Sequence, residues 1–153
     1  MARARKPKGS ASTGTASADP RAEVVRRIVA LAELLEKSDR WDESVRLIER
    51  DEGKELELDT REREPSSWLT FSREGHVVEH SCEYSGHNGD SYGHKERVLD
   101  PVESLRRLEG LAHMLEGRAL AMEERRLEEA AHRHRQELAR SNLNARLRGK
   151  GIV

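Results

Sequence analysis

The last third of the sequence is a stretch whose apolar residues repeat with the period of an α-helix. Asp100-Pro101 is a typical helix start, because a capping carboxylate precedes a proline at the first helical position, and no further proline follows. A helix from Pro101 to about Leu147 would be roughly 65–70 Å long at about 1.5 Å per residue. No small core covers that length, so the half beyond Met122 is expected to project into solvent or to pair with a partner.

Apolar residues at alternating steps of three and four predict a coiled-coil stripe on this helix. The stripe weakens after Met122 and continues as Leu127, Ala131, His134 and Leu138. Gly110 and Gly117 are seven residues apart and could admit a second backbone. The predicted oligomer or partner-helix interface is Leu105, Leu108, Ala112, Leu115, Ala119, Met122 and Leu127. The alternative is that this stripe packs on the chain's own sheet.

The composition favours a protein that completes its core against another copy of itself. Aromatic residues make up 3% of the chain and charged residues 37%, which leaves few side chains for a core. We therefore expect a homo-oligomer. Cys82 is the only cysteine, which excludes an intramolecular disulfide, and no apolar run is long enough to span a membrane. The expected compartment is the cytoplasm.

The charge is unevenly distributed, with both ends basic and the middle acidic. Residues 1–18 carry a net charge of +4, residues 132–153 carry +5, and residues 19–131 carry −10. Such ends could contact an acidic protein or the phosphates of nucleic acid. The predicted contact residues are Arg3, Arg5, Lys6, Lys8, Arg133, Arg135, Arg140, Arg146, Arg148 and Lys150. Sequence-specific DNA reading is not expected, because the candidate recognition helix over 40–51 is acidic.

The rest of the chain predicts an α+β fold with two short helices before a small sheet. Residues 1–19 are low in complexity and are expected to be a disordered basic tail. Asp19-Pro20 predicts a helix over 20–37, and the spacing of Trp41, Val45 and Ile48 predicts a second helix over 40–51. With the long helix, the predicted body spans 20–122, and 123–153 form a charged, basic extension.

Strands are predicted within 54–99, as a three- or four-stranded antiparallel meander. A two-residue turn at Glu74-Gly75 would pair residue 71 with 78 and 69 with 80. That register predicts one mostly apolar face, formed by Leu69, Phe71, Val78, His80, Cys82 and Tyr84. A second turn at Asn88-Gly89 would set Tyr84 opposite Gly93.

The histidines of this sheet are the candidates for metal chemistry. Imidazole and thiolate ligands suit zinc, and residues two apart on a strand point the same way. The candidate ligands are His76, His80, Cys82, His87 and His94. No paired ligand motif supports them, and His76 and His80 would be about 13 Å apart on a strand. Packing is therefore the favoured interpretation, and neither a metal nor another cofactor is expected.

A non-enzymatic assembly or adaptor module is the function that these features favour. A cysteine nucleophile would need Cys82 to be exposed, whereas the strand pattern places it at least partly buried. The module would self-associate through its last helix and contact an acidic partner through its basic ends. A small nucleic-acid-associated accessory or regulatory protein is the first alternative, and a zinc-binding protein is the second.

Overall fold

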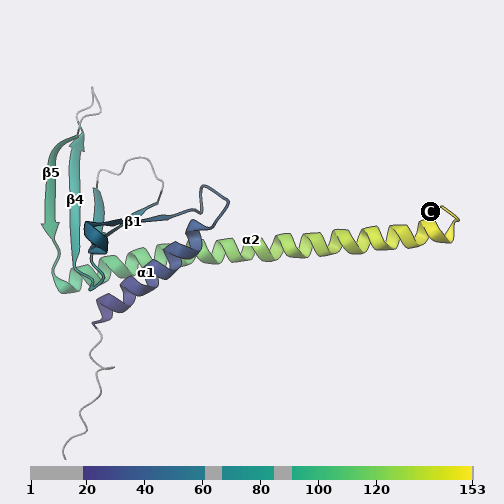
Figure 1. Cartoon of the computed structure of the whole chain (residues 1–153), viewed down its shortest axis with the longest axis horizontal. Coiled ribbons are helices and arrows are strands. Elements are labelled where there is room, and N and C mark those ends of the chain that lie inside the picture. Colours follow the sequence, from purple (N-terminus) through teal and green to yellow (C-terminus); the bar gives the residue numbers. More distant parts are fainter. Residues whose placement is uncertain (1–18, 61–66, 85–90, 153) are drawn as a thin grey trace, which may run out of the picture.

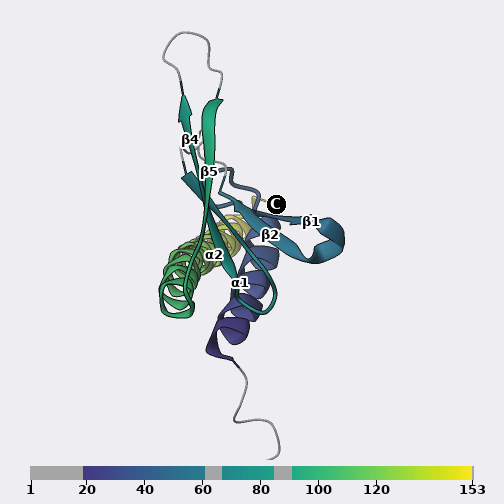
Figure 2. The ribbon, with the colours of Figure 1, turned by 90° about the vertical axis from the view of Figure 1, so that its left-hand side faces the viewer.

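The computed structural model describes residues 19–60, 67–84 and 91–152 as one α+β body with a long helical projection. A five-stranded antiparallel sheet lies at one end of helix α2 (Pro101–Gly149), and the shorter helix α1 (Pro20–Glu36) packs beside the first part of α2 (Figures 1 and 2). The expected α+β class and the long C-terminal helix are confirmed. Residues 1–18, the main part of the expected disordered tail, lie outside the described residues.

Both helices begin where the sequence predicts, because each start is encoded locally. The Asp19 carboxylate accepts a hydrogen bond from the Arg21 backbone N–H at 3.0 Å, and the Asp100 carboxylate accepts one from Glu103 N–H at 2.8 Å. In each case proline follows at the first helical position, where its missing N–H costs nothing. α2 is one continuous helix, and Gly151 ends it.

The end of α2 is a Schellman motif, in which backbone N–H groups satisfy the last carbonyl groups of the helix. Ile152 N–H donates to Leu147 C=O at 2.9 Å, and Gly151, at a φ of 75°, donates to Arg148 C=O at 3.1 Å. The left-handed conformation of Gly151 suits a residue without a side chain.

The strands form a meander with the order β1-β2-β3-β4-β5. The five strands are β1 (Arg46–Arg50), β2 (Glu55–Asp59), β3 (Ser67–Phe71), β4 (Val77–Tyr84) and β5 (Ser91–Val98). The predicted meander topology is correct, but the described residues form five strands rather than three or four. The additional strand is β1.

The predicted helix over 40–51 is wrong. Residues 46–50 are strand β1, which pairs with β2 so that Leu47 faces Leu58 and Glu49 faces Leu56. Trp41, expected on a buried face, is 68% exposed. The spacing of Trp41, Val45 and Ile48 fits a helix, but pairing with β2 satisfies the backbone of this short segment and overrides that local pattern.

The predicted turn at Glu74-Gly75 is one residue too short. Ser72 N–H donates to His76 C=O at 2.9 Å, which leaves a three-residue loop over 73–75 with Gly75 at a φ of 92°. Phe71 therefore faces Val77, and Trp68 faces His80. Since side chains alternate along a strand, this shift moves Val78 and His80 to the face opposite Phe71.

The expected pairing across the next hairpin is also wrong. Tyr84 lies opposite Ser91 rather than Gly93, and the register shifts between Ser81 and Glu83. Residues 85–90, which include the Asn88-Gly89 turn signal, lie outside the described residues. A bulge at this point adds twist and local bending to a strand pair.

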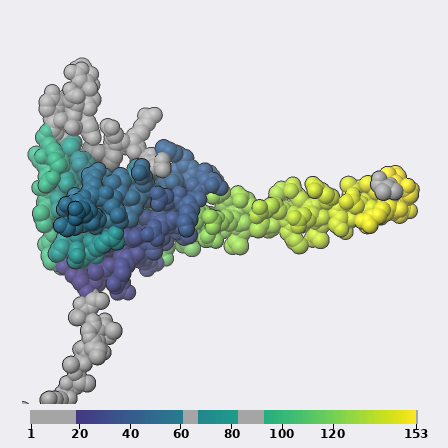
Figure 3. All heavy atoms as spheres, viewed as in Figure 1, coloured from purple at the N-terminus to yellow at the C-terminus, as the bar shows by residue number. Residues whose placement is uncertain are grey.

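The core lies between α1, the first part of α2 and the inner face of the sheet. Both helices contribute an apolar stripe, and the sheet contributes Leu56, Phe71 and Val77. The fully buried residues from the helices include Val25, Ile28, Ala32, Leu35, Leu108, Leu115 and Met122. The core ends near Met122, and beyond it α2 leaves the body (Figure 3).

Glu43 anchors the loop before β1 to α2 at the point where the helix leaves the body. Its carboxylate, on a residue 8% exposed, accepts hydrogen bonds from the Arg125 guanidinium at 2.7 and 3.1 Å and from Ser38 Oγ at 2.8 Å. The Arg125 guanidinium, followed by the Ser38 hydroxyl, holds the pKa of Glu43 below its usual value. The contact therefore stabilises the folded chain while Glu43 is ionised.

We expect Glu43→Gln to lower the melting temperature at pH 7 and to have little effect in acid. Because the pKa of Glu43 is lower in the folded chain, its contribution is complete above the usual carboxyl range of about 4.3 and disappears as the pH falls through the folded value. Thermal melts of both proteins at pH 7 and pH 3, followed by circular dichroism, measure this. Glu129→Gln is the matched control, because Glu129 also pairs with Arg125 but its side chain is 56% exposed. An equal deficit at both pH values would contradict the assignment.

Candidate functional site

A pair of histidines on the outer face of the sheet is the most distinctive cluster of polar side chains in the described part of the chain. His80 of β4 faces Glu96 of β5, and His94 lies two residues from Glu96 on the same face. Trp68 of β3 faces His80 from the other side. Three neighbouring strands thus place their side chains in one row on the face turned away from the helices.

The two imidazoles and the carboxylate converge at short distances. His80 Nδ1 lies 3.0 Å from His94 Nε2, and Glu96 Oε1 lies 3.6 Å from the first atom and 3.8 Å from the second. The His80 side chain is 9% exposed, whereas those of His94 and Glu96 are about half exposed. The cluster is therefore rooted in the sheet on one side and open to solvent on the other.

Thr70 and Trp68 hold the buried member of the pair. Thr70, 2% exposed, has its Oγ1 2.8 Å from His80 Nε2, so each ring nitrogen of His80 has a partner. The ring planes of Trp68, His80 and His94 are parallel within 8°, with centroids 5.2–5.5 Å apart. The hydrogen bond and the parallel rings restrict the orientation of His80.

The structure brings together two of the five metal candidates from the sequence and adds a carboxylate. His76 is exposed at the 73–75 loop, and Cys82 is half-buried at the register shift; His87 lies outside the described residues. Sequence reasoning missed Glu96, although its alternation with His94 along a predicted strand was the signal that could have found it.

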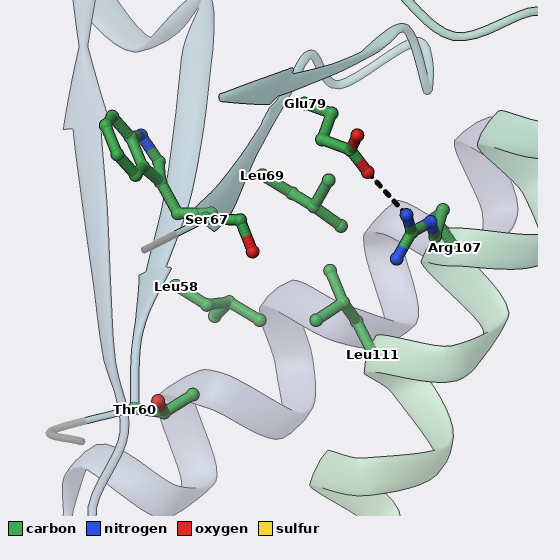
Figure 4. A pocket seen from close by; sticks show the side chains of 8 residues that line it. Leu58, Thr60, Ser67, Leu69, Glu79, Arg107 and Leu111 are labelled. Carbon is green, nitrogen blue, oxygen red and sulfur yellow. Dashed lines mark hydrogen bonds and ion pairs between the residues drawn. The ribbon is translucent and has the colours of Figure 1, made fainter. Parts of the chain in front are cut away.

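A hollow lies on the inner face, between the sheet and α2 (Figure 4). Its volume is about 270 Å³, and Leu58, Leu69 and Leu111 point into it. At its edge the Glu79 carboxylate accepts hydrogen bonds from Arg107 and from Arg97, the latter at 3.3 Å. Thr60 and Ser67 also line the hollow, so its surface combines polar and apolar groups.

The predicted interface residues of α2 divide between the core and the surface. Leu108, Ala112, Leu115, Ala119 and Met122 are buried within the chain and Leu105 is half-buried, whereas Leu127 is 70% exposed. Met122 and Leu127 are five residues apart, so they do not share a helix face. Leu127 instead continues the face of Leu120, which is 60% exposed.

The projecting part of α2 carries most of the predicted basic contact residues. Arg133, Arg135, Arg140, Arg146, Arg148 and Lys150 are all exposed. The four basic residues Arg3, Arg5, Lys6 and Lys8 lie outside the described residues, so the two basic ends are not placed relative to each other.

No family model, no curated protein sequence and no solved structure matches this chain. Neither of the two helices in the described part of the chain has an apolar stretch that could cross a membrane.

Proposed function

We propose that this protein is an assembly module that forms a homodimer by antiparallel pairing of the projecting halves of two α2 helices. The observation that supports this most is an exposed heptad stripe where α2 has no body to pack on. The stripe begins at Leu120, resumes one heptad later at Leu127, and then follows steps of four and three. Its members are Leu120, Leu127, Ala131, His134, Leu138, Ser141 and Ala145.

The stripe is suited to a partner helix rather than to the chain's own core. Leu127 and Leu138 are 70% and 51% exposed, and every residue over 126–146 is exposed. An isolated helix in water gains little stability from propensity alone, so a second helix over this stripe would stabilise the projection. A second copy presents the same stripe, and two-fold pairing is the commonest symmetry of soluble oligomers.

Charge favours the antiparallel orientation. Residues 123–129 carry a net charge of −2, and residues 130–150 carry +5. Antiparallel pairing places the acidic segment of each copy beside the basic segment of the other. A parallel pair would bring the two basic segments together, and like charges across a coiled coil are unfavourable.

One antiparallel register matches the side chains on both sides of the seam. It sets Leu127 against Leu138 of the second copy and Ala131 against His134 of the second copy. In the flanking positions it sets Glu128 against Arg135 of the second copy, and the two-fold axis repeats this pair. Such flanking ion pairs set partner choice and orientation in coiled coils.

In the proposed pair, the second copy would be the acidic partner of the basic end of α2. In this register the end of each helix, which carries Arg146, Arg148 and Lys150, lies beside the body of the second copy. The segment 19–131, which includes the body, carries a net charge of −10. The second copy would thus supply the acidic surface that the basic end contacts, and the cytoplasm is the compartment in which we expect this assembly.

Replacing both exposed leucines by Leu127→Glu and Leu138→Glu should convert the dimer to a monomer. In the proposed register each glutamate would face another across the seam, where two carboxylates repel each other in place of the apolar leucine contact. Sedimentation velocity over a hundredfold concentration range measures the change. Leu143→Glu is the matched control, because Leu143 is 56% exposed but lies on another face of α2. A wild-type protein that stays monomeric at every concentration, with or without binding to duplex DNA, would contradict the proposal.

Spin labels would distinguish the two orientations. In a Cys82→Ser background, a label at Arg146→Cys should lie about 40 Å along the helix axis from its equivalent, given a rise of about 1.5 Å per residue. A parallel pair would bring the two labels side by side, which would overturn the antiparallel register. Glu128→Arg or Arg135→Glu alone should weaken the dimer, and the double exchange should restore it.

A further inference from the structure

We propose that His80, His94 and Glu96 form a binding site for a divalent transition-metal ion of the zinc class on the outer face of the sheet. This inference does not depend on helix pairing. The site lies on β4 and β5, at the end of the molecule opposite the projecting end of α2 (Figure 1). It departs from the sequence-based interpretation, which favoured packing for these histidines.

The spacing of the three candidate ligand atoms fits a small tetrahedral ion. Zinc binds nitrogen at about 2.0–2.1 Å and carboxylate oxygen at about 2.0–2.2 Å, so neighbouring ligand atoms of a tetrahedron lie about 3.3–3.5 Å apart. The distances here are 3.0, 3.6 and 3.8 Å, between His80 Nδ1, His94 Nε2 and Glu96 Oε1. An ion could bind all three atoms after only small side-chain movements.

Thr70 supplies the outer contact that a metal-binding histidine needs. A ligating imidazole must present a lone pair to the ion, and its other ring nitrogen then carries the proton. With Nδ1 as the ligand atom of His80, Nε2–H can donate to Thr70 Oγ1, which lies 2.8 Å away. Because Thr70 is buried, this contact is protected from water and fixes the ring of His80.

In the ion-free protein the His80–His94 contact is a hydrogen bond between the two rings. Two imidazole nitrogens 3.0 Å apart are at the distance of an N–H···N hydrogen bond, in which one nitrogen donates its proton to the lone pair of the other. To bind a metal ion through Nε2, His94 would carry its proton on Nδ1 instead, and Glu96 would supply negative charge beside the ion. Since His94 and Glu96 are about half exposed, the ion could enter from solvent and keep a water molecule as its fourth ligand.

The ligand set selects the class of ion. Two imidazoles and one carboxylate suit zinc and its transition-metal neighbours, whereas calcium and magnesium prefer sites made of oxygen atoms. The set therefore predicts zinc binding that a large excess of magnesium does not prevent.

Zinc titration of protein purified without a histidine tag tests the site. In the Trp41→Phe background Trp68 is the only tryptophan, and it lies beside both histidines, so its fluorescence should change on binding. Isothermal titration calorimetry should give one zinc ion per chain. The melting temperature should rise with zinc, because an ion that binds only the folded chain stabilises it.

Variants at the exposed ligands should lose zinc binding without unfolding the protein. His94→Ala and Glu96→Gln should each lower zinc affinity at least tenfold while the ion-free protein melts as the wild type does. Thr70→Val should also lower the affinity, by about 10- to 100-fold, as loss of an outer contact does elsewhere. His113→Ala is the control, because His113 is exposed on α2 and is not part of the cluster. Absence of zinc binding, or equal affinity in the wild type and His94→Ala, would overturn the proposal and leave helix pairing unaffected.

Discussion

Replacing Gly75 by alanine should destabilise the protein by about 2–4 kcal/mol, combining backbone strain with a steric overlap. Gly75 closes the β3–β4 hairpin at a φ of 92°, a conformation that residues with a side chain rarely adopt. An alanine Cβ here would lie 2.3 Å from Arg21 Cβ and 3.0 Å from the Arg21 carbonyl carbon. The overlap cannot be relieved by a rotamer change, because these atoms belong to or adjoin the backbone at the start of α1.

Gly93→Ala separates the two causes. Gly93 also has a positive φ, 62°, but nothing lies within 4 Å of the position of an added Cβ. We expect it to lose only the backbone term, about 1–2 kcal/mol. Urea unfolding followed by circular dichroism measures both variants. An equal loss of unfolding free energy in the two variants would show that the contact between the hairpin loop and α1 does not contribute to stability.

That contact also explains why the register of this hairpin could not be read from the sequence. Glu74-Gly75 is a good signal for a two-residue turn, and it placed Phe71 and His80 on one face. The structure uses a three-residue loop, in which Gly75 packs against Arg21, a residue distant in the sequence. A change of one residue in the loop length moves every side chain of β4 to the other face of the sheet. The observed loop length goes with the packing of Gly75 against α1.

The histidine site shows the same limit. His80 and His94 were recognised as candidates because imidazoles suit metals, but their partner Glu96 was not. With the predicted register, His80 belonged to the core face beside Phe71. The observed register places it opposite Glu96 and Trp68 on the outer face. The chemical character of the histidines could be read from the sequence. The neighbours of His80 could not, because they depend on how three strands pair.

Features encoded by a few adjacent residues were predicted correctly. The Asp-Pro starts of α1 and α2 each rely on contacts within three residues of the cap. β1 was missed because its stability comes from β2, and the spacing of its apolar residues also fits a helix. Helix caps are therefore readable here, whereas the strand register is not, because it depends on residues distant in the chain.

The expected division of α2 near Met122 leads to the second large prediction. Leu115 and Leu127 lie on one continuous helix, but Leu115 is fully buried in the core and Leu127 is 70% exposed. Leu115→Ala should lower the free energy of unfolding by about 2–5 kcal/mol, since it removes buried apolar contacts and leaves a cavity. Urea unfolding measures this loss at a concentration low enough to keep the chain monomeric.

Leu127→Ala is the matched control, and it also tests the proposed dimer. In the monomer it should change the stability of the body by no more than about 0.5 kcal/mol, as surface substitutions usually do. At higher concentration it should weaken the dimer, and the melting temperature of the wild type should then rise with concentration more than that of the variant. Leu115→Ala should lower the melting temperature at every concentration. If Leu127→Ala destabilised the dilute monomer as much as Leu115→Ala does, the second half of α2 would belong to the folded body, and its exposed stripe would need no second copy.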